Sequence, residues 1–187
     1  TASTSGIVSD FRFTDAGNET IVADVGTLGG GDTFLDGSST DSDTLSITSI
    51  GNSGTFTANR IENINIESIS GTSVLDMTNV NNTSAISVSG AVDTRIDVLD
   101  AQTKQPSITS NGYTRDLVID AVTFAGTAAA GNAETINVTV QGASFGTTAA
   151  TQSNVSIEAG TAGTLETLNI TSAGSTANVY GLDADTN

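Results

Sequence analysis

Short apolar pairs, with one polar residue between their two members, recur along this chain. Residues two apart lie on the same face of an extended strand, so such pairs are typical of half-buried β-strands. Three stretches are nearly identical in pattern: residues 61–66, 133–138 and 165–170. Each stretch begins with an apolar residue followed by Glu. Asn or Thr comes next, and the stretch ends with two apolar residues separated by Asn. Self-similar strands within one chain predict a repeat architecture.

The interval between successive apolar pairs is nearly constant over much of the chain. Two series of positions show this regular interval: Ile47, Ile66 and Ile86, and then Val118, Val138 and Ile157. A spacing of about 20 residues is typical of one rung of a β-solenoid, in which each turn of the chain stacks on its neighbour. We therefore predict an all-β parallel solenoid; antiparallel β-sandwich modules are the alternative.

The same pattern divides the chain into segments. Residues 1–28 are predicted to be N-terminal cap or linker strands, and residues 29–47 are a turn rich in Gly and Asp. Residues 44–182 form the predicted solenoid body, and residues 183–187 are a tail. An excursion from the body is expected near 100–116, which holds the only Pro, because Pro is poorly tolerated within a paired strand.

Charge and composition argue against several classes of function. The chain has 21 acidic and 5 basic residues, a formal net charge of −16 at pH 7, and no His or Cys. So few cations disfavour binding to nucleic acid and to anionic membrane surfaces. Without His or Cys, the chain cannot use either residue as a catalytic base or nucleophile. It also lacks the usual ligands of zinc, haem and iron–sulfur sites. A hard cation held by oxygen atoms is the metal chemistry that remains.

No apolar run is long enough to cross a bilayer, so no membrane insertion is expected. The first residue is not Met, and we expect the sequence to be part of a longer chain.

The sharpest local motif lies in residues 29–47. Gly-x-Asp-x-apolar spans Gly30 to Phe34, and Asp-x-apolar recurs at Asp43. Four carboxylates fall close together in this motif: Asp32, Asp36, Asp41 and Asp43. Such a cluster repels itself, and a divalent cation would relieve the repulsion. We predict a calcium site formed by these four Asp residues and Gly30; a solvated turn without an ion is the alternative.

This motif resembles the calcium-binding nonapeptide repeats of RTX proteins, which have the consensus Gly-Gly-x-Gly-x-Asp-x-apolar-x. The two Asp residues that match, Asp32 and Asp43, are farther apart than one nonapeptide. A wider resemblance includes the strands Asp-Thr-Leu-Ser-Ile at 43–47 and Arg-Ile-Glu-Asn-Ile-Asn-Ile at 60–66. This succession is similar to the repeating body of bacterial surface-layer proteins that leave the cell by type I secretion.

The resemblance implies a right-handed parallel β-solenoid, of the β-helix or β-roll kind, that binds Ca²⁺. It implies a structural module without enzymatic activity, located on the bacterial cell surface, which assembles with copies of itself into a two-dimensional coat. Contact with cell-surface polysaccharide would then be made by parts of the protein outside this sequence.

Two other functions stay open. The chain would also suit a calcium-binding adhesin or the stalk segment of a large secreted protein. A carbohydrate-active β-helix enzyme would need paired carboxylates, and Glu62 with Asp93 or Asp97 are the candidates. Sugar-cleaving grooves usually carry aromatic residues and cations, of which this chain has few.

Other acidic residues have simpler expected roles. The Glu residue in each self-similar stretch is predicted to accept backbone N–H groups at a corner rather than to bind calcium: Glu62, Glu134 and Glu166. Asp183 and Asp185 are candidates for the start of a second calcium turn.

Overall fold

Parallel pairing is the rule throughout the described part of this computed structural model, and the strands form three sheets. The structure describes residues 10–13, 16–24, 28–29, 31–48, 52–68, 73–90, 94–97, 106–111, 117–121, 135–141, 154–159, 167–173 and 181–186. Among these residues no helix is long and apolar enough to span a membrane.

The chain coils into stacked turns, and successive turns contribute strands to the three sheets. The four-stranded sheet contains, in order, β1 (Asp10–Phe13), β3 (Thr33–Asp36), β5 (Thr57–Asn59) and β8 (Asn79–Asn81). The seven-stranded sheet contains β2 (Thr20–Asp24), β4 (Thr44–Thr48), β6 (Asn63–Ser68), β9 (Ala85–Gly90), β11 (Ser107–Asn111), β13 (Thr135–Gln141) and β15 (Thr167–Ala173). The five-stranded sheet contains β7 (Ser73–Asp76), β10 (Thr94–Asp97), β12 (Leu117–Ala121), β14 (Asn154–Ala159) and β16 (Gly181–Thr186).

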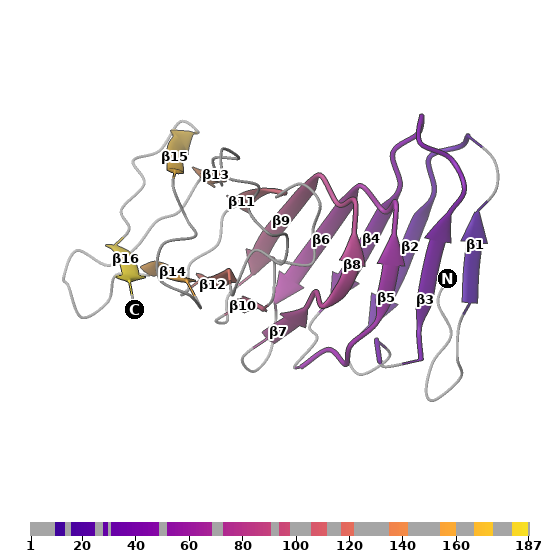
Figure 1. Cartoon of the computed structure of the whole chain (residues 1–187), viewed down its shortest axis with the longest axis horizontal. Coiled ribbons are helices and arrows are strands. Elements are labelled where there is room, and N and C mark those ends of the chain that lie inside the picture. The colour runs from indigo at the N-terminus through magenta and orange to yellow at the C-terminus, as the bar shows by residue number, and fades with distance from the viewer. Residues whose placement is uncertain are drawn as a thin grey trace, which may run out of the picture.

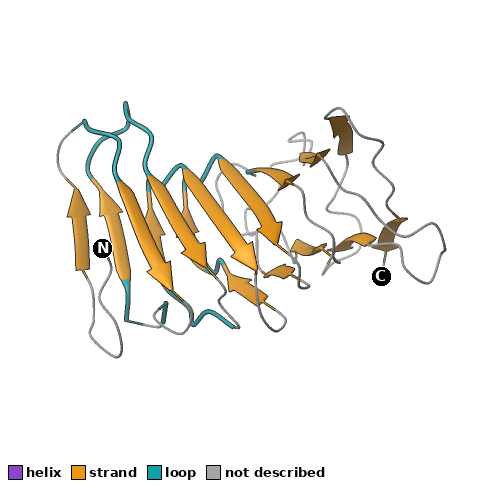
Figure 2. Cartoon of the chain, turned by 180° about the vertical axis from the view of Figure 1, so that it is seen from behind, coloured by secondary structure: helices purple, strands orange, loops and turns teal. Residues whose placement is uncertain are grey.

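Each strand of the seven-stranded sheet comes from a new turn of the chain (Figures 1 and 2). Thr44 pairs with Asn63, which is the shortest step between neighbouring strands of this sheet. The longest step is the last one, in which Thr135 pairs with Thr167. All of these pairings are parallel. The chain is therefore an all-β parallel solenoid, as the sequence predicts, and the antiparallel sandwich alternative is wrong.

The alternation of apolar and polar residues explains why these segments are strands. In β4 the buried residues are Leu45 and Ile47, and the residue between them, Ser46, is partly exposed. In β6, Ile64 and Ile66 are buried, while Asn65 is exposed. Burial of one such aliphatic side chain stabilises the fold by about 1.5–3 kcal/mol relative to exposure.

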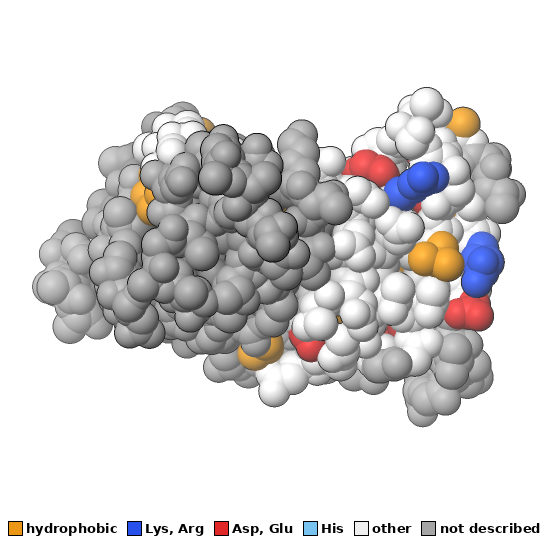
Figure 3. Space-filling view, viewed as in Figure 1, with side chains coloured by type: hydrophobic (Ala, Val, Ile, Leu, Met, Phe, Trp, Pro, Cys, Tyr) orange, Lys and Arg blue, Asp and Glu red, His pale blue; other side chains and the backbone are white. Residues whose placement is uncertain are grey.

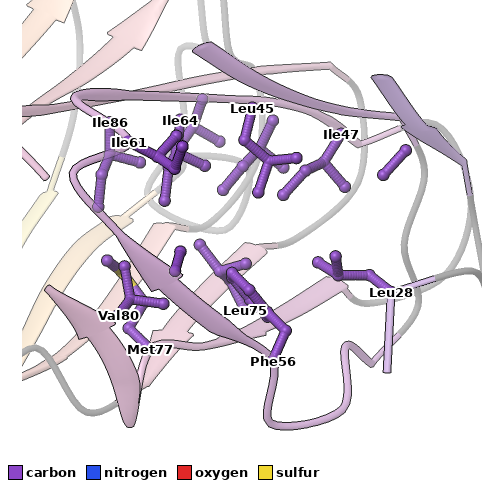
Figure 4. Packing of buried hydrophobic residues seen from close by; sticks show 14 of the residues in the cluster. Leu28, Leu45, Ile47, Phe56, Ile61, Ile64, Leu75, Met77, Val80 and Ile86 are labelled. Atoms are coloured by element: carbon purple, nitrogen blue, oxygen red, sulfur yellow. The ribbon is translucent and has the colours of Figure 1, made fainter. Parts of the chain in front are cut away.

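The core lies between the sheets and is filled from both sides. Figure 4 shows Leu45, Ile64 and Ile86 of the seven-stranded sheet in one row, which faces Leu75 and Val80 across the interior. Aromatic rings fill the part of the core that belongs to the first turns. The ring of Phe34 stacks on Phe11, with centroids 5.7 Å apart, and meets Phe56 edge to face at 6.2 Å. Such aromatic pairs add about 0.5–1.5 kcal/mol beyond their burial.

The predicted boundaries differ from the structure at three places. Residues 107–111, inside the expected excursion at 100–116, form β11 in the middle of the seven-stranded sheet. Pro106 directly precedes this strand, where its missing N–H removes no hydrogen bond from the ladder.

Asp183 and Asp185 pair with β14 as part of β16, so they form a strand rather than a calcium turn. The described part of residues 1–28 forms the first described turn of the solenoid, and among the described strands β1 and β2 lie at one end of their sheets.

The regularly spaced apolar residues of the second half belong to two sheets rather than one. Val118 lies on β12 and Ile157 on β14, both in the five-stranded sheet. Val138 lies on β13 in the seven-stranded sheet, where its partner is Ile108. The regular interval in this half of the sequence therefore connects two different sheets of the same solenoid.

Candidate metal centre

The crossing from the four-stranded to the seven-stranded sheet differs in length between turns. After β5 and after β8 it is short, covering positions 60–62 and 82–84, and each crossing begins with a residue of positive φ. These residues are Arg60, at 61°, and Asn82, at 65°. After β3 the crossing is longer and covers positions 37–43, which we call the 37–43 loop. This longer loop carries two of the predicted calcium ligands, Asp41 and Asp43.

An acidic residue directly precedes each of the first three strands of the seven-stranded sheet: Glu19, Asp43 and Glu62. The backbone N–H of Glu19 donates to Oδ1 of Asp43 at 2.8 Å. The backbone N–H of Asp43 donates in turn to Oε2 of Glu62 at 2.9 Å. The side chains of Asp43 and Glu62 thus each accept the N–H of the acidic residue in the preceding turn. This confirms the corner role predicted for Glu62; Glu134 and Glu166 lie outside the described residues.

Asp43 is fully buried, and its second carboxylate oxygen, Oδ2, has no hydrogen-bond donor. Burial raises the pKa of Asp43, because a charged carboxylate is less stable away from water. The backbone N–H of Glu19 opposes this shift, and so, more weakly, does a hydrogen bond with the Glu19 side chain. The nearby charges of Asp36 and Asp41 raise the pKa further. Among the described residues, no positively charged group contributes to the pKa shift of Asp43.

Other carboxylates surround Asp43. One carboxylate oxygen each from Glu19, Asp41 and Asp43 lies within 4.8 Å of the other two. Both oxygens of Asp41 are buried and have no hydrogen-bond donor. Asp36 is 5% exposed; its Oδ2 accepts the N–H of Ser38 at 2.7 Å, and its Oδ1 has no donor. A buried polar atom without a partner costs about 1–3 kcal/mol, and more when it is charged.

These residues fit a calcium ion in donor type and spacing. Ca²⁺ takes six to eight oxygen ligands at about 2.3–2.6 Å, so two ligands of one ion lie no more than about 5 Å apart. The carboxylate oxygens of Glu19, Asp41 and Asp43 meet this limit. The donor-free oxygens of Asp41 and Asp43 are those that an ion would satisfy.

The neighbouring turns hold the 37–43 loop at several points. From the first turn, the carbonyl of Phe13 accepts the N–H of Gly37 at 3.0 Å, and Oδ1 of Asn18 accepts the N–H of Ser42 at 2.9 Å. From the third turn, Nη1 of Arg60 donates to the carbonyl of Gly37 at 2.9 Å. These three bonds are made with backbone atoms of the loop, which leaves its carboxylates available to a cation.

Not every predicted ligand lies here. Oδ2 of Asp32 accepts the N–H of Gly29 at 2.8 Å, and the N–H of Asp32 donates to the Gly29 carbonyl at 3.0 Å. Asp32 thereby closes its own turn at the start of β3, and the extended strand separates it from Asp36 by about 13 Å. The structure brings Asp36, Asp41 and Asp43 together, and places Asp32 elsewhere. Gly30 lies outside the described residues.

Glu19 is the member of the centre that the sequence prediction missed. It is distant from Asp43 in sequence, so no local motif includes both residues. A signal was present, however, since Glu19-Thr-Ile, Asp43-Thr-Leu and Glu62-Asn-Ile share an acidic residue, Thr or Asn, and an aliphatic residue. Alignment of the strands on this triplet would have placed Glu19 beside Asp43.

Asp76, at the end of β7, shows what a fully satisfied carboxylate looks like in this fold. Its Oδ2 accepts from Oγ1 of Thr55 at 2.7 Å, and its Oδ1 accepts from the N–H of Thr78 at 2.9 Å. Burial alone would raise the pKa of Asp76, but the hydrogen bonds from Thr78 and Thr55 outweigh it and hold the pKa below its usual value. The pKa of Asp43 shifts in the opposite direction, and Oδ2 of Asp43 has no such donor.

The paired carboxylates considered for an enzyme belong to different parts of the solenoid. Glu62 precedes β6 in the seven-stranded sheet, whereas Asp97 ends β10 in the five-stranded sheet. Asp93 lies outside the described residues.

Comparison of the chain with family models, with curated proteins and with solved structures gave no match.

Proposed function

We propose that this chain is a structural module of a secreted bacterial surface-layer protein, which Ca²⁺ stabilises and which assembles with copies of itself into a cell-surface coat. The observation that carries the calcium part is the set of buried carboxylate oxygens without donors at Asp36, Asp41 and Asp43. Glu19, Asp41 and Asp43 would hold the ion, and Asp36 would add negative charge beside it.

The energetics of the centre support a bound cation. Three carboxylates whose oxygens lie within 4.8 Å repel one another, and burial strengthens the repulsion because little water screens it. A divalent cation would convert this repulsion into attraction. A ligand that binds only the folded state stabilises it by about 2.7 kcal/mol at a concentration one hundred times its dissociation constant.

The architecture supports a structural role. Parallel ladders join each described strand to the next turn, which gives a long, regular body (Figure 1). On the face drawn in Figure 3, the described surface is mainly backbone and neutral polar side chains, with a few acidic, basic and hydrophobic groups. A net charge of −16 would keep copies apart at low salt, and divalent ions between surface carboxylates would reduce that repulsion.

Calcium binding can be tested on the whole chain by titration calorimetry and by thermal unfolding. The chain has no Trp and two Tyr, so circular dichroism or scanning calorimetry is the better probe of unfolding. We expect Ca²⁺ to raise the melting temperature and excess EDTA to lower it again. Replacement Asp41→Asn should weaken Ca²⁺ binding at least tenfold. Glu67→Gln, at an exposed acidic residue of β6, is the matched control and should bind Ca²⁺ as the natural chain does.

Assembly needs a separate measurement. Light scattering after gel filtration, with negative-stain microscopy of the same fractions, should show ordered multimers in Ca²⁺ and monomers in EDTA. A chain that binds Ca²⁺ but stays monomeric at all concentrations would favour the adhesin or stalk alternative over the coat. A chain whose calorimetric titration and melting temperature do not respond to Ca²⁺ would refute the calcium part.

A further inference from the structure

The candidate centre joins two turns of the solenoid. Glu19 belongs to the first turn, which includes β1 and β2, whereas Asp41 and Asp43 belong to the second, which includes β3 and β4. Glu62 of the third turn accepts the N–H of Asp43 but is not among the three residues whose oxygens converge. An ion at this centre would therefore act on the contact between the first and second turns.

We infer that the centre is a cation-dependent latch, which holds the first turn of the solenoid on the second and so controls whether the backbone edges of β3 and β4 are covered. This inference rests on the calcium site proposed above. It adds that the ion stabilises the contact between the first and second turns in particular. An ion that only stabilised the whole solenoid would affect all turns equally.

Among the described residues, strand pairing holds the first turn on one side, whereas it holds the turns inside the stack on both sides. Within the described part of the chain, β1 pairs only with β3 and β2 pairs only with β4, so each is an end strand. Strand β6, by comparison, pairs on both sides, with β4 and with β9. The ring of Phe11 stacks on Phe34 but is only partly buried. Elements at such ends open at lower free energy than the core of a fold.

Carboxylate repulsion acts at the contact between the first and second turns. The N–H of Thr44 donates to the carbonyl of Glu19 at 2.9 Å, and the N–H of Glu19 donates to Asp43 Oδ1 at 2.8 Å. These two bonds hold the backbone of Glu19 against the start of β4 in the next turn. Without a cation, the negative charges of Glu19, Asp41 and Asp43 oppose the docking that the backbone bonds favour.

Release of the first turn would uncover the strands of the second turn. Strands β3 and β4 would become the end strands, and their edge N–H and C=O groups would lose the partners that β1 and β2 supply. The fully buried ring of Phe34 would lose its stacking partner Phe11. A sheet edge of this kind is a template for pairing with another strand. The cation would thus control access to the edges of β3 and β4.

Hydrogen exchange, measured by mass spectrometry on the whole chain, tests the latch turn by turn. In EDTA we expect exchange of residues 10–13, 20–24, 33–36 and 44–48 to rise about tenfold relative to Ca²⁺. Exchange of β9, well inside the stack, should not change. Glu19→Gln removes one charge and keeps the backbone bonds, so its first turn should be protected in EDTA and should gain no further protection from Ca²⁺. Glu67→Gln, the control, should respond to Ca²⁺ as the natural chain does.

The outcomes separate the two ideas. If Ca²⁺ binds by calorimetry but changes exchange equally in β2, β6 and β9, the latch is refuted and the calcium site stands. If Ca²⁺ neither binds nor changes exchange in any turn, the proposed calcium site itself fails. If Glu19→Gln keeps the full Ca²⁺ response of its first turn, the latch is refuted, because Glu19 is the residue through which the first turn reaches the centre.

Discussion

Oδ1 of Asp43 accepts the backbone N–H of Glu19, a residue 24 positions earlier in the chain, at 2.8 Å. The bond connects the starts of β2 and β4 and places a buried carboxylate directly between two turns. A neutral side chain could make the same bond, since an amide oxygen also accepts. The negative charge of Asp43 is thus not needed for the hydrogen bond, and its burial beside Asp36 and Asp41 opposes the fold.

Replacement of Asp43 should separate these two effects. Asp43→Asn keeps an acceptor for the N–H of Glu19 and removes a charge from the buried cluster, so we expect a higher melting temperature than the natural chain in EDTA. The same variant should lose most of the Ca²⁺-induced rise in melting temperature. Asp43→Ala removes the acceptor as well and should be destabilised by about 1–3 kcal/mol relative to Asp43→Asn. Chemical unfolding in EDTA and in Ca²⁺ measures all three chains.

Equal stability of Asp43→Asn and the natural chain, in EDTA and in Ca²⁺ alike, would contradict the electrostatic account of the centre.

The repeated strands could be predicted because their signal is local. In residues such as Leu45, Ile64 and Ile86 the apolar side chain and its strand spacing are both present in the sequence. Which turn of the solenoid pairs with which cannot be read in the same way. Val118 and Val138 are spaced like neighbouring rungs, yet they belong to different sheets, because the length of a turn varies with its corners.

The acidic cluster of the candidate centre could be predicted in part for the same reason. Asp36, Asp41 and Asp43 are near one another in sequence, so a local motif finds them. Asp32 is equally near but lies at the opposite end of β3, where it closes the turn with Gly29. Glu19 reaches the centre only because β2 and β4 stack in register, which is a property of the fold.

Gly90, at the end of β9, occupies a position that only glycine fits without strain. Its φ is +116°, and a Cβ placed there would lie 2.1 Å from the backbone oxygen of Ser68 in the neighbouring strand. Gly90→Ala should therefore destabilise the protein by about 3 kcal/mol or more, because rigid backbone cannot move away. Gly29→Ala is the control, since nothing lies within 4 Å of its Cβ position. Denaturant unfolding of both variants in Ca²⁺ tests this, and equal stability would show that the approach of Gly90 to Ser68 does not constrain the fold.

Asp76 provides a dependence on pH that is separate from the candidate metal centre. Its pKa in the folded protein lies below the ordinary value of 3.8, so ionisation of Asp76 favours folding. The stabilisation is fully present above the unfolded pKa and is lost as the pH falls through the folded pKa. Asp76→Asn should therefore be less stable than the natural chain at pH 7, and the difference should shrink below about pH 4. Urea unfolding from pH 7 to pH 3 gives the comparison, and a difference that grows with acid would have the wrong sign.

An acidic residue occupies the same register position in all five strands of the five-stranded sheet: Asp76, Asp97, Asp120, Glu158 and Asp185. Neighbouring strands are about 4.8 Å apart, and like charges at paired positions destabilise a sheet. Asp120 has an acidic partner on both sides, so Asp120→Asn should raise the melting temperature in 10 mM salt. The gain should fall in 1 M salt, where the screening length drops from about 30 Å to about 3 Å.

The control for this column is Glu67→Gln, because the partners of Glu67 in β4 and β9 are the neutral residues Thr48 and Ser89. Removal of its charge should change stability by less than about 0.5 kcal/mol at either salt concentration. Thermal unfolding of both variants at both salt concentrations, with EDTA present, separates the effect of the column from the effect of net charge. If Glu67→Gln and Asp120→Asn raise the melting temperature equally, the total negative charge of the chain and not the register of the column sets the repulsion.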